Sequence, residues 1–150
     1  MTETEKLKQQ LQVRQVAFSA SIKSVESQTI GPFDSHTILI YNNVFTNVGN
    51  AYSPHTGIFA APVRGAYHFE FHVAGPGNSS HGLCTVLVRN GMHVVTAWDQ
   101  KESTFGSSSN GVTLILEAGD QVFMRLWSQY KIYDDQHHYS TFSGHMLFAM

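Results

Sequence analysis

Apolar and polar residues alternate along most of the chain, and this period of two predicts β-strands. Residues 16–22 carry an apolar side chain at every second position, and Tyr67, Phe69 and Phe71 alternate with polar residues. In a strand, residues two apart share one face. Further apolar, β-branched or aromatic runs, each bounded by turn-forming residues, cover 37–45, 83–89, 92–98, 112–117, 121–128 and 140–148.

Turn signals between these runs predict antiparallel hairpins. Asn90-Gly91 lies between two runs, and both residues tolerate the positive φ of a two-residue hairpin turn. Ala118-Gly119-Asp120 marks a second turn, and the serines at 107–109 are expected in a flexible loop tip. No long helical pattern follows residue 15, so the chain is predicted to be an all-β antiparallel sandwich or barrel.

The first fifteen residues have a different pattern. Leu7 and Leu11 lie four residues apart among charged residues, which places them on one helical face. A helix of about four turns is marginal alone in water. Residues 1–15 are therefore either the end of a coiled coil or a helical or disordered solvated tail, and two leucines do not decide between them. Residues 16–150 form the predicted globular domain.

Two of the predicted strands are apolar on both faces. They are residues 112–116 and residues 122–127. The outer faces of an isolated two-layer sandwich should be polar. These strands therefore predict that another subunit covers the outer face.

Composition and charge exclude several classes of protein. The chain has 150 residues, of which 42% are hydrophobic and 13% are charged, and its net charge is −2. A nucleic-acid-binding protein normally carries an excess of basic residues, so nucleic acid is not expected as a partner. No apolar run approaches the roughly 18 residues of a membrane span, so membrane insertion is not expected either.

The single cysteine and the start of the chain bear on the cellular compartment. Cys84 is the only cysteine, so neither an internal disulfide nor a thiolate zinc site is possible, and a buried inert thiol is expected. The chain starts without the apolar stretch of a signal peptide. Asn78-Ser79-Ser80 fits the N-glycosylation pattern, which favours secretion only weakly because such short patterns are common.

A long gapped pattern runs through the first half of the globular region. Phe59 lies six residues before Gly65, and the earlier positions follow at further gaps of seven, five and six. The pattern consists of Tyr41, Asn47, Tyr52, Phe59, Gly65, Tyr67, Phe69 and Phe71. It resembles the signature of the C1q-type globular head family, relatives of the tumour necrosis factor (TNF) jelly rolls, although Tyr41 stands where that family usually has Phe. Further matches extend the resemblance over residues 16–150.

The resemblance implies a ten-strand, TNF-like antiparallel jelly roll that assembles as a homotrimer. It implies a secreted protein that acts by binding rather than catalysis, often behind a collagen-like or coiled-coil stalk. The helix-prone start resembles the coiled-coil variant, because no Gly-X-Y repeat is present. Complement-like innate immunity and extracellular signalling are the roles that such proteins have.

The histidines invite a metal hypothesis, which their spacing disfavours. On a strand, His68 and His72 lie about 13 Å apart, whereas ligands of one zinc ion each lie about 2 Å from it. No His-x-His pair typical of metal-dependent jelly-roll enzymes is present, nor is any nucleophile elbow or phosphate loop. Solvent-facing or interface positions are expected for these histidines, and no cofactor is expected.

Calcium is a second metal hypothesis. Asp99 matches a position that binds calcium in some members of the family, but the loop that follows carries Ser and Gly where a second Asp is typical. Fewer charged ligands weaken calcium binding, so calcium is the less favoured interpretation. The acidic and histidine-rich residues 134–138 could bind a cation or titrate, but an ordinary solvated turn is favoured.

These observations predict a non-enzymatic, secreted, trimeric recognition module for an extracellular protein, a receptor or a microbial surface. Its ligand is expected at the polar loops 78–81, 101–108 and 132–138. The alternatives are a cytokine-like receptor ligand of the TNF type and, less favoured, a metal-dependent jelly-roll enzyme. The candidate ligand-binding residues are Asn78, His81, Lys101, Asp134, Asp135 and His137.

Overall fold

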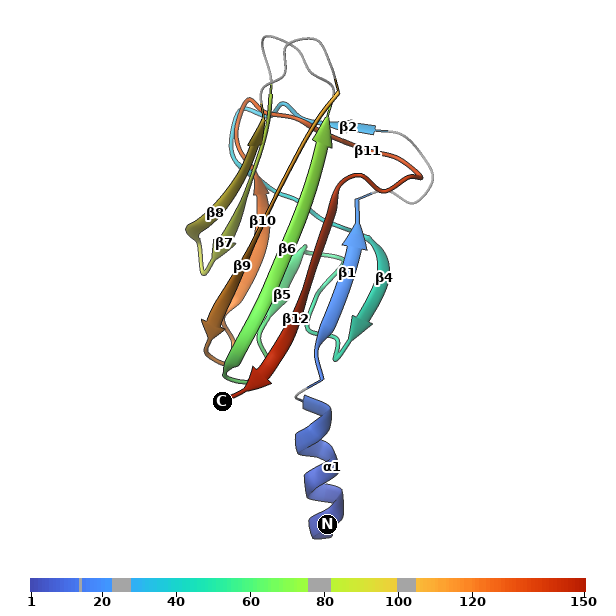
Figure 1. The fold of residues 1–150 in the computed structure, drawn as a ribbon, viewed down its shortest axis with the longest axis vertical. Helices are drawn as coiled ribbons and strands as arrows, with labels where there is room; N and C mark the ends of the chain where they lie inside the picture. Colours follow the sequence, from blue (N-terminus) through green and yellow to red (C-terminus); the bar gives the residue numbers. More distant parts are fainter. Residues whose placement is uncertain (14, 23–27, 76–81, 100–104) are drawn as a thin grey trace.

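The chain folds into two β-sheets that pack face to face, with one helix projecting from one end (Figure 1). The computed structural model describes all residues except 14, 23–27, 76–81 and 100–104. The described elements are α1 (Glu3–Val13), β1 (Ala17–Ser21), β2 (Gln28–Ile30), β3 (Thr37–Ile38), β4 (Asn43–Val48), β5 (Ile58–Ala60), β6 (Gly65–Gly75), β7 (Leu83–Arg89), β8 (Met92–Asp99), β9 (Gly106–Leu116), β10 (Gln121–Leu126), β11 (Ile132–Asp134) and β12 (Thr141–Ala149).

The topology is that of an antiparallel jelly roll, as predicted. One five-stranded sheet has the order β4-β1-β12-β6-β9, and the second has the order β3-β10-β7-β8 with β5 also paired to β10. These two sheets together contain the ten expected strands. A separate two-stranded sheet of β11 and β2 adds to them. The sequence pattern missed β2 and β11 because each has only three residues.

The centre of the sandwich is a cluster of aromatic rings. Tyr67, Phe69 and Phe71 of β6 point inward and are at most 1% exposed. The ring of Phe69 lies 5.1 Å from that of Phe59 and 6.2 Å from that of Phe142, between ring centroids. Aromatic rings at such distances contribute beyond the apolar area that they bury. The strand around Phe69 therefore has the inside and outside faces that its alternation predicts.

Buried hydrogen bonds explain the spacing of the early signature residues. The Tyr52 hydroxyl donates to the Tyr41 carbonyl at 2.8 Å and accepts from the Tyr41 amide at 3.1 Å. The Asn47 side-chain amide donates to the Tyr52 carbonyl at 2.7 Å. Burial raises the pKa of Tyr52 to about 12, although its hydrogen bond with Tyr41 acts in the opposite direction. These three residues fasten the segment before β5 to the loop between β3 and β4.

The expectation that another subunit must cover both doubly apolar strands is wrong for β10. Phe123, on its outer face, is only 9% exposed because it packs within the same chain against Cys84, Val86 and Val88 of β7. In β9, the outer face is polar from Ser107 to Thr113, and only Ile115 is an exposed large apolar residue.

The expectation of a loop tip at the serines 107–109 is also wrong. These residues belong to β9 and pair with residues 72–74 of β6. Pairing along the long strand β6 overrides the weak strand preference of serine.

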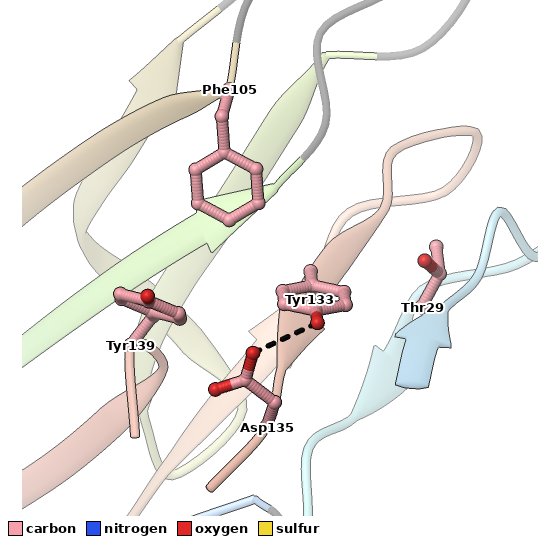
Figure 2. Close-up of a pocket in the computed structure, with 5 residues that line it drawn as sticks. All are labelled: Thr29, Phe105, Tyr133, Asp135 and Tyr139. Carbon is pink, nitrogen blue, oxygen red and sulfur yellow. Dashed lines mark hydrogen bonds between the residues drawn. The ribbon is translucent and has the colours of Figure 1, made fainter. Parts of the chain in front are cut away.

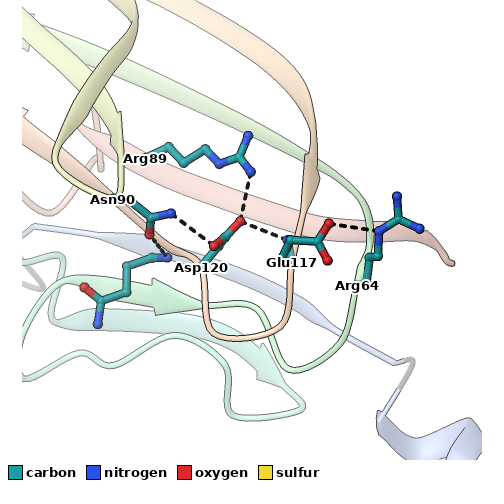
Figure 3. Close-up of polar contacts among 6 residues, drawn as sticks. Arg64, Arg89, Asn90, Glu117 and Asp120 are labelled. Atoms are coloured by element: carbon teal, nitrogen blue, oxygen red, sulfur yellow. Dashed lines mark hydrogen bonds and ion pairs between the residues drawn. The ribbon is translucent and has the colours of Figure 1, made fainter.

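A polar network joins the turn of the β7–β8 hairpin to the turn between β9 and β10 (Figure 3). The expectation of a hairpin at Ala118-Gly119-Asp120 is wrong, because β9 and β10 belong to different sheets. Asp120 accepts hydrogen bonds from the Arg89 guanidinium at 2.9 Å, from the Asn90 side-chain amide at 3.0 Å and from the Glu117 backbone amide at 2.9 Å. Asn90 in turn accepts from the Gln121 amide at 2.8 Å. The two turns that the sequence predicts are therefore held to each other.

Helix α1 begins with a reciprocal cap and lies beyond the sheets (Figure 1). The Thr2 hydroxyl accepts from the Glu5 amide at 3.1 Å, and the Glu5 carboxylate accepts from the Thr2 amide at 3.0 Å. This capping box satisfies backbone donors at the first turn. Leu7 and Leu11 are 53% and 58% exposed, so the described residues of one chain leave them largely open to solvent. Whether residues 1–15 end a coiled coil stays a prediction.

Among the described residues, no helix is long and apolar enough to cross a membrane.

Candidate functional site

A pocket of about 550 Å³ opens at the end of the sandwich farthest from α1 (Figures 1 and 2). Its walls come from β2, β11, the residue before β9 and the loop before β12. The lining residues are Thr29, Phe105, Tyr133, Asp135 and Tyr139. Segments that lie far apart in the sequence therefore meet around one hollow.

The short sheet of β2 and β11 sets the orientation of Tyr133. Ile132 is fully buried in the core, and alternation along the strand turns the next residue, Tyr133, to the other side. Tyr133 pairs across the sheet with Thr29, so both face the pocket. The same alternation turns Asp134 back into the protein, where it is fully buried.

Asp134 links β11 to two neighbouring backbone segments behind the pocket. Its carboxylate accepts hydrogen bonds from the backbone amides of Ile22 at 3.1 Å and Ser140 at 3.3 Å. The expectation of a solvated turn is wrong for Asp134 and also for Asp135, which is 9% exposed. The sequence gives no sign of this burial because Asp also occurs in ordinary exposed turns.

Three aromatic rings stand around the opening (Figure 2). The ring of Phe105 meets that of Tyr133 at 5.6 Å and 88°, and that of Tyr139 at 5.7 Å and 62°. The two tyrosine rings lie 6.5 Å apart at 32°. Phe105 is 51% exposed and Tyr139 is 44% exposed, so solvent reaches both. The rings pack edge-to-face on one another, and because solvent reaches two of them they form a partly exposed aromatic wall of the pocket.

The carboxylate of Asp135 lies beside these rings. Asp135 accepts hydrogen bonds from the His137 amide at 2.7 Å and from the Tyr133 hydroxyl at 2.9 Å. The bond from the His137 amide, followed by that from Tyr133, lowers the pKa of Asp135 below its ordinary value. Asp135 is therefore ionised at neutral pH. Among the residues that the structure describes, no Lys or Arg forms an ion pair with it.

The other predicted ligand-binding residues are placed as follows. His137 is exposed, and its ring lies 5.9 Å from that of Tyr139, so it borders the pocket. Asn78, with its possible glycosylation, His81 and Lys101 lie outside the described residues. The structure thus brings Asp135 and His137 together, whereas Asp134 faces inward. A role of any of them in binding stays a prediction.

Sequence reasoning missed the aromatic walls of the site. Phe105 and Tyr133 fall inside two of the predicted ligand loops, and Tyr139 follows the second, but the prediction names only polar side chains. The available signal was the presence of large rings inside otherwise polar, turn-rich segments. Such rings have no obvious place in a loop unless they pack or bind.

The metal hypotheses concern the histidines and Asp99. Among the described residues, no group of three or more His, Cys, Asp and Glu residues is arranged to hold a metal ion. Asp99 ends β8 and is partly buried. Calcium at Asp99 stays a prediction.

The histidines of β6 meet at one carboxylate. Glu70 lies 3.1 Å from the Nε2 atom of His68 and 4.0 Å from that of His72, between the nearest nitrogen and oxygen atoms. His68 also bonds to the Thr113 hydroxyl at 2.9 Å. These residues face outward from the first sheet, as the alternation predicts.

Comparison with known proteins identifies the family. The C1q domain family matches residues 17–147. The B-type subunit of the complement C1q subcomponent from Homo sapiens is 32% identical over 139 residues, which amount to 90% of this chain and 51% of that protein. The chain thus spans about half the length of this curated relative. The chain belongs to the C1q domain family.

Solved structures share the fold. The globular domain of the zebrafish complement 1qA protein has a TM-score of 0.69 at 19% identity, over 91% of this chain and 99% of that one. Murine APRIL at pH 5.0 has a TM-score of 0.68 at 12% identity, over 89% and 99% of the two chains. Eiger TNF from S. frugiperda has a TM-score of 0.68 at 11% identity, over 91% and 95%. Family and fold together indicate a ligand-binding recognition module.

Proposed function

We propose that this chain is the head of a secreted, non-enzymatic homotrimer that recognises an extracellular protein, a receptor or a microbial surface. Membership of the C1q domain family supports binding rather than catalysis as its activity. The aromatic pocket at the free end of the head supplies a surface for recognition. The observation that carries the trimer is an exposed apolar row at the opposite end.

This apolar row crosses three neighbouring strands of the first sheet. Ala66 of β6 pairs with Ile115 of β9 on one side and with Phe148 of β12 on the other. Paired residues point to the same face of a sheet, so the three side chains form one outward row. Ile115 is 43% exposed and Phe148 is 58% exposed, which leaves large apolar groups in water. A second copy of the same face would cover them.

The location of this row fits a threefold assembly. It lies at the end of the sandwich where the chain terminates and where α1 projects (Figure 1). Leu7 and Leu11 of α1 are also exposed there. One symmetry axis along this end would bury the row and the helical leucines together. The three pockets at the opposite end would then act jointly, so weak single contacts would add up to strong attachment.

Sedimentation equilibrium at micromolar concentration tests the assembly. We expect a mass three times the 16.7 kDa of the chain. A chelator should leave this mass unchanged, because calcium is not the favoured interpretation. A folded, monodisperse monomer at this concentration would contradict the proposal.

A cytokine-like receptor ligand is the second candidate. The TM-scores to APRIL and to Eiger TNF nearly equal that to the complement domain, so the fold alone does not separate these functions. High-affinity binding to a single cell-surface receptor would favour the cytokine. Metal analysis addresses the enzyme alternative, because stoichiometric, tightly held zinc or iron that is lost on mutating His68 and His72 would overturn the binding module.

A further inference from the structure

We propose that the aromatic pocket binds a trimethylammonium group, held by Phe105, Tyr133 and Tyr139 and by the charge of Asp135. The inference rests on the proposed recognition function and names the chemical group that the head would recognise. It does not require the trimer, because all the residues that it uses belong to one chain.

The shape of the site suits a compact cation. Three rings approach one another at centroid distances of 5.6 to 6.5 Å and at angles between 32° and 88°. Figure 2 shows the rings around the opening, with the Asp135 carboxylate beside Tyr133. Aromatic faces carry partial negative charge, and they attract cations within about 6 Å of the ring centroid. Phe105 packs edge-to-face against both tyrosine rings, so the three rings form one continuous aromatic wall of the pocket against which a compact cation can lie.

The charge of the site also favours a cationic ligand. Asp135 is ionised and largely buried, and in the described part of the chain it has no Lys or Arg as ion-pair partner. Among the described residues, negative charge therefore lies beside the aromatic rings without a Lys or Arg ion-pair partner, and the nearby charges that act on Asp135 come from His137 and His138. A cationic ligand fills the role of that partner.

Hydrogen bonding favours a methylated ammonium over a primary one. The Asp135 carboxylate accepts two hydrogen bonds, one from the His137 amide and one from the Tyr133 hydroxyl, and it keeps acceptor sites for only part of a ligand's donors. A primary ammonium brings three donors that need acceptors, whereas a trimethylammonium group brings none. Its methyl groups make apolar contacts with the rings while its charge interacts with the carboxylate. The pocket therefore matches a quaternary ammonium group better than a primary one.

Titration of the intact protein with choline at pH 7.5, followed by calorimetry or NMR, tests the inference. We expect a dissociation constant on the order of 1 mM, as suits a few ring contacts and one charge. The neutral analogue 3,3-dimethyl-1-butanol has the same shape without the charge, and it should bind at least about tenfold more weakly. Equal binding of the two compounds, or no binding of choline, would overturn the proposal.

Variants of the pocket separate the ring effect from the charge effect. Tyr139→Ala should weaken choline binding by about tenfold or more, whereas Tyr139→Phe, which keeps the ring, should stay within about twofold. Asp135→Asn keeps one acceptor oxygen for the His137 amide, and its NH2 group can donate to the Tyr133 hydroxyl oxygen, so it should weaken choline binding about fivefold or more and leave binding of the neutral analogue unchanged. Trp98→Ala, which removes an exposed ring outside the pocket, is the matched control and should bind choline normally.

Two further measurements separate the possible failures. Phosphocholine and trimethyl-lysine are titrated in parallel, and the tighter of the two identifies the kind of molecule that carries the group. Binding of simple hexoses in the absence of choline binding would show a sugar site and overturn the inference. Sedimentation of the same samples keeps the tests distinct, because a trimer that ignores choline contradicts only this inference, whereas a monomer that binds choline contradicts only the proposed assembly.

Discussion

Gly144 of β12 lies where a side chain would collide with two rings of the core. A Cβ atom at this position would lie 2.6 Å from Cδ1 of Phe69 and 2.8 Å from Cε1 of Phe18. Both rings are buried and in contact with other rings, so they have little space to retreat. The absence of a side chain at Gly144 is thus what allows these two rings to approach the sheet.

Gly144→Ala should therefore destabilise the domain by overpacking. We expect a loss of about 1–3 kcal/mol in the free energy of unfolding, measured by urea denaturation. Ser143→Ala, at the neighbouring outward-facing position, is the matched control and should change stability by less than about 0.5 kcal/mol. The double variant Gly144→Ala with Phe69→Leu should recover part of the loss. Strictly additive effects would show that the two residues do not compete for space.

Substitution of Phe69 tests the assignment of the inward face of β6. It is fully buried and contacts several rings. Phe69→Ala should cost about 3–5 kcal/mol, because it removes a buried ring and leaves a cavity. His72→Ala, on the outer face of the same strand, should cost less than about 0.5 kcal/mol. Comparable losses at both positions would contradict the assigned faces.

Among the elements, Asp120 links the turn of the β7–β8 hairpin to the turn between β9 and β10, and the stability that this link contributes should depend on pH. Hydrogen bonds, first from Asn90 and then from the Glu117 amide, lower the pKa of Asp120 below its ordinary value. A lowered pKa in the folded state means that the stabilisation is present above the ordinary pKa of the carboxyl group. It is lost as the pH falls through the folded-state pKa.

Asp120→Asn should thus lower the Tm at pH 7, and its difference from the wild type should shrink as the pH falls towards 3. Thermal melts followed by circular dichroism measure this effect. Glu117→Gln is the control, because its ion pair with Arg64 is exposed and contributes little. A constant difference between Asp120→Asn and the wild type from pH 7 to pH 3 would contradict a role of the ionised carboxylate.

Helix α1 gives a prediction of its own, because its leucines have no cover within one chain. If Leu7 and Leu11 pack between helices of a trimer, Leu11→Asp should reduce the helical circular dichroism signal, since an isolated helix of this length is marginal. Gln9→Asp introduces the same residue away from the leucine face and should have a smaller effect. Equal effects of the two variants would favour a solvated tail.

The sequence predicted elements well where one local pattern was sufficient. The alternation around Phe69 and the turn signal at Asn90 each appear in the structure where they were expected. The run at residues 37–45 was expected as one strand but is divided into β3 and the start of β4. The Tyr41 backbone between them bonds to the Tyr52 hydroxyl instead of to a neighbouring strand.

The site was less predictable because it depends on segments that meet only after folding. Phe105, Tyr133 and Tyr139 each resemble an isolated loop aromatic in the sequence, and no spacing rule links them. Their convergence depends on the three-residue pairing of β2 with β11, which is too short to give a pattern. Asp134 and Asp135 are neighbours of the same residue type, and strand alternation gives them opposite directions and different environments.

For the whole molecule, the central question is what covers the row formed by Ile115, Ala66 and Phe148. Ile115→Glu places a charge within the proposed threefold contact, where desolvation of the carboxylate would be costly. We expect sedimentation equilibrium to show a shift from trimer towards monomer at micromolar concentration. Met92 is 74% exposed and lies on the second sheet, so Met92→Glu is the matched control and should leave the trimer intact. If Ile115→Glu stays trimeric while Met92→Glu dissociates, the contact lies on the other sheet, and the three pockets would then be arranged differently from the proposal.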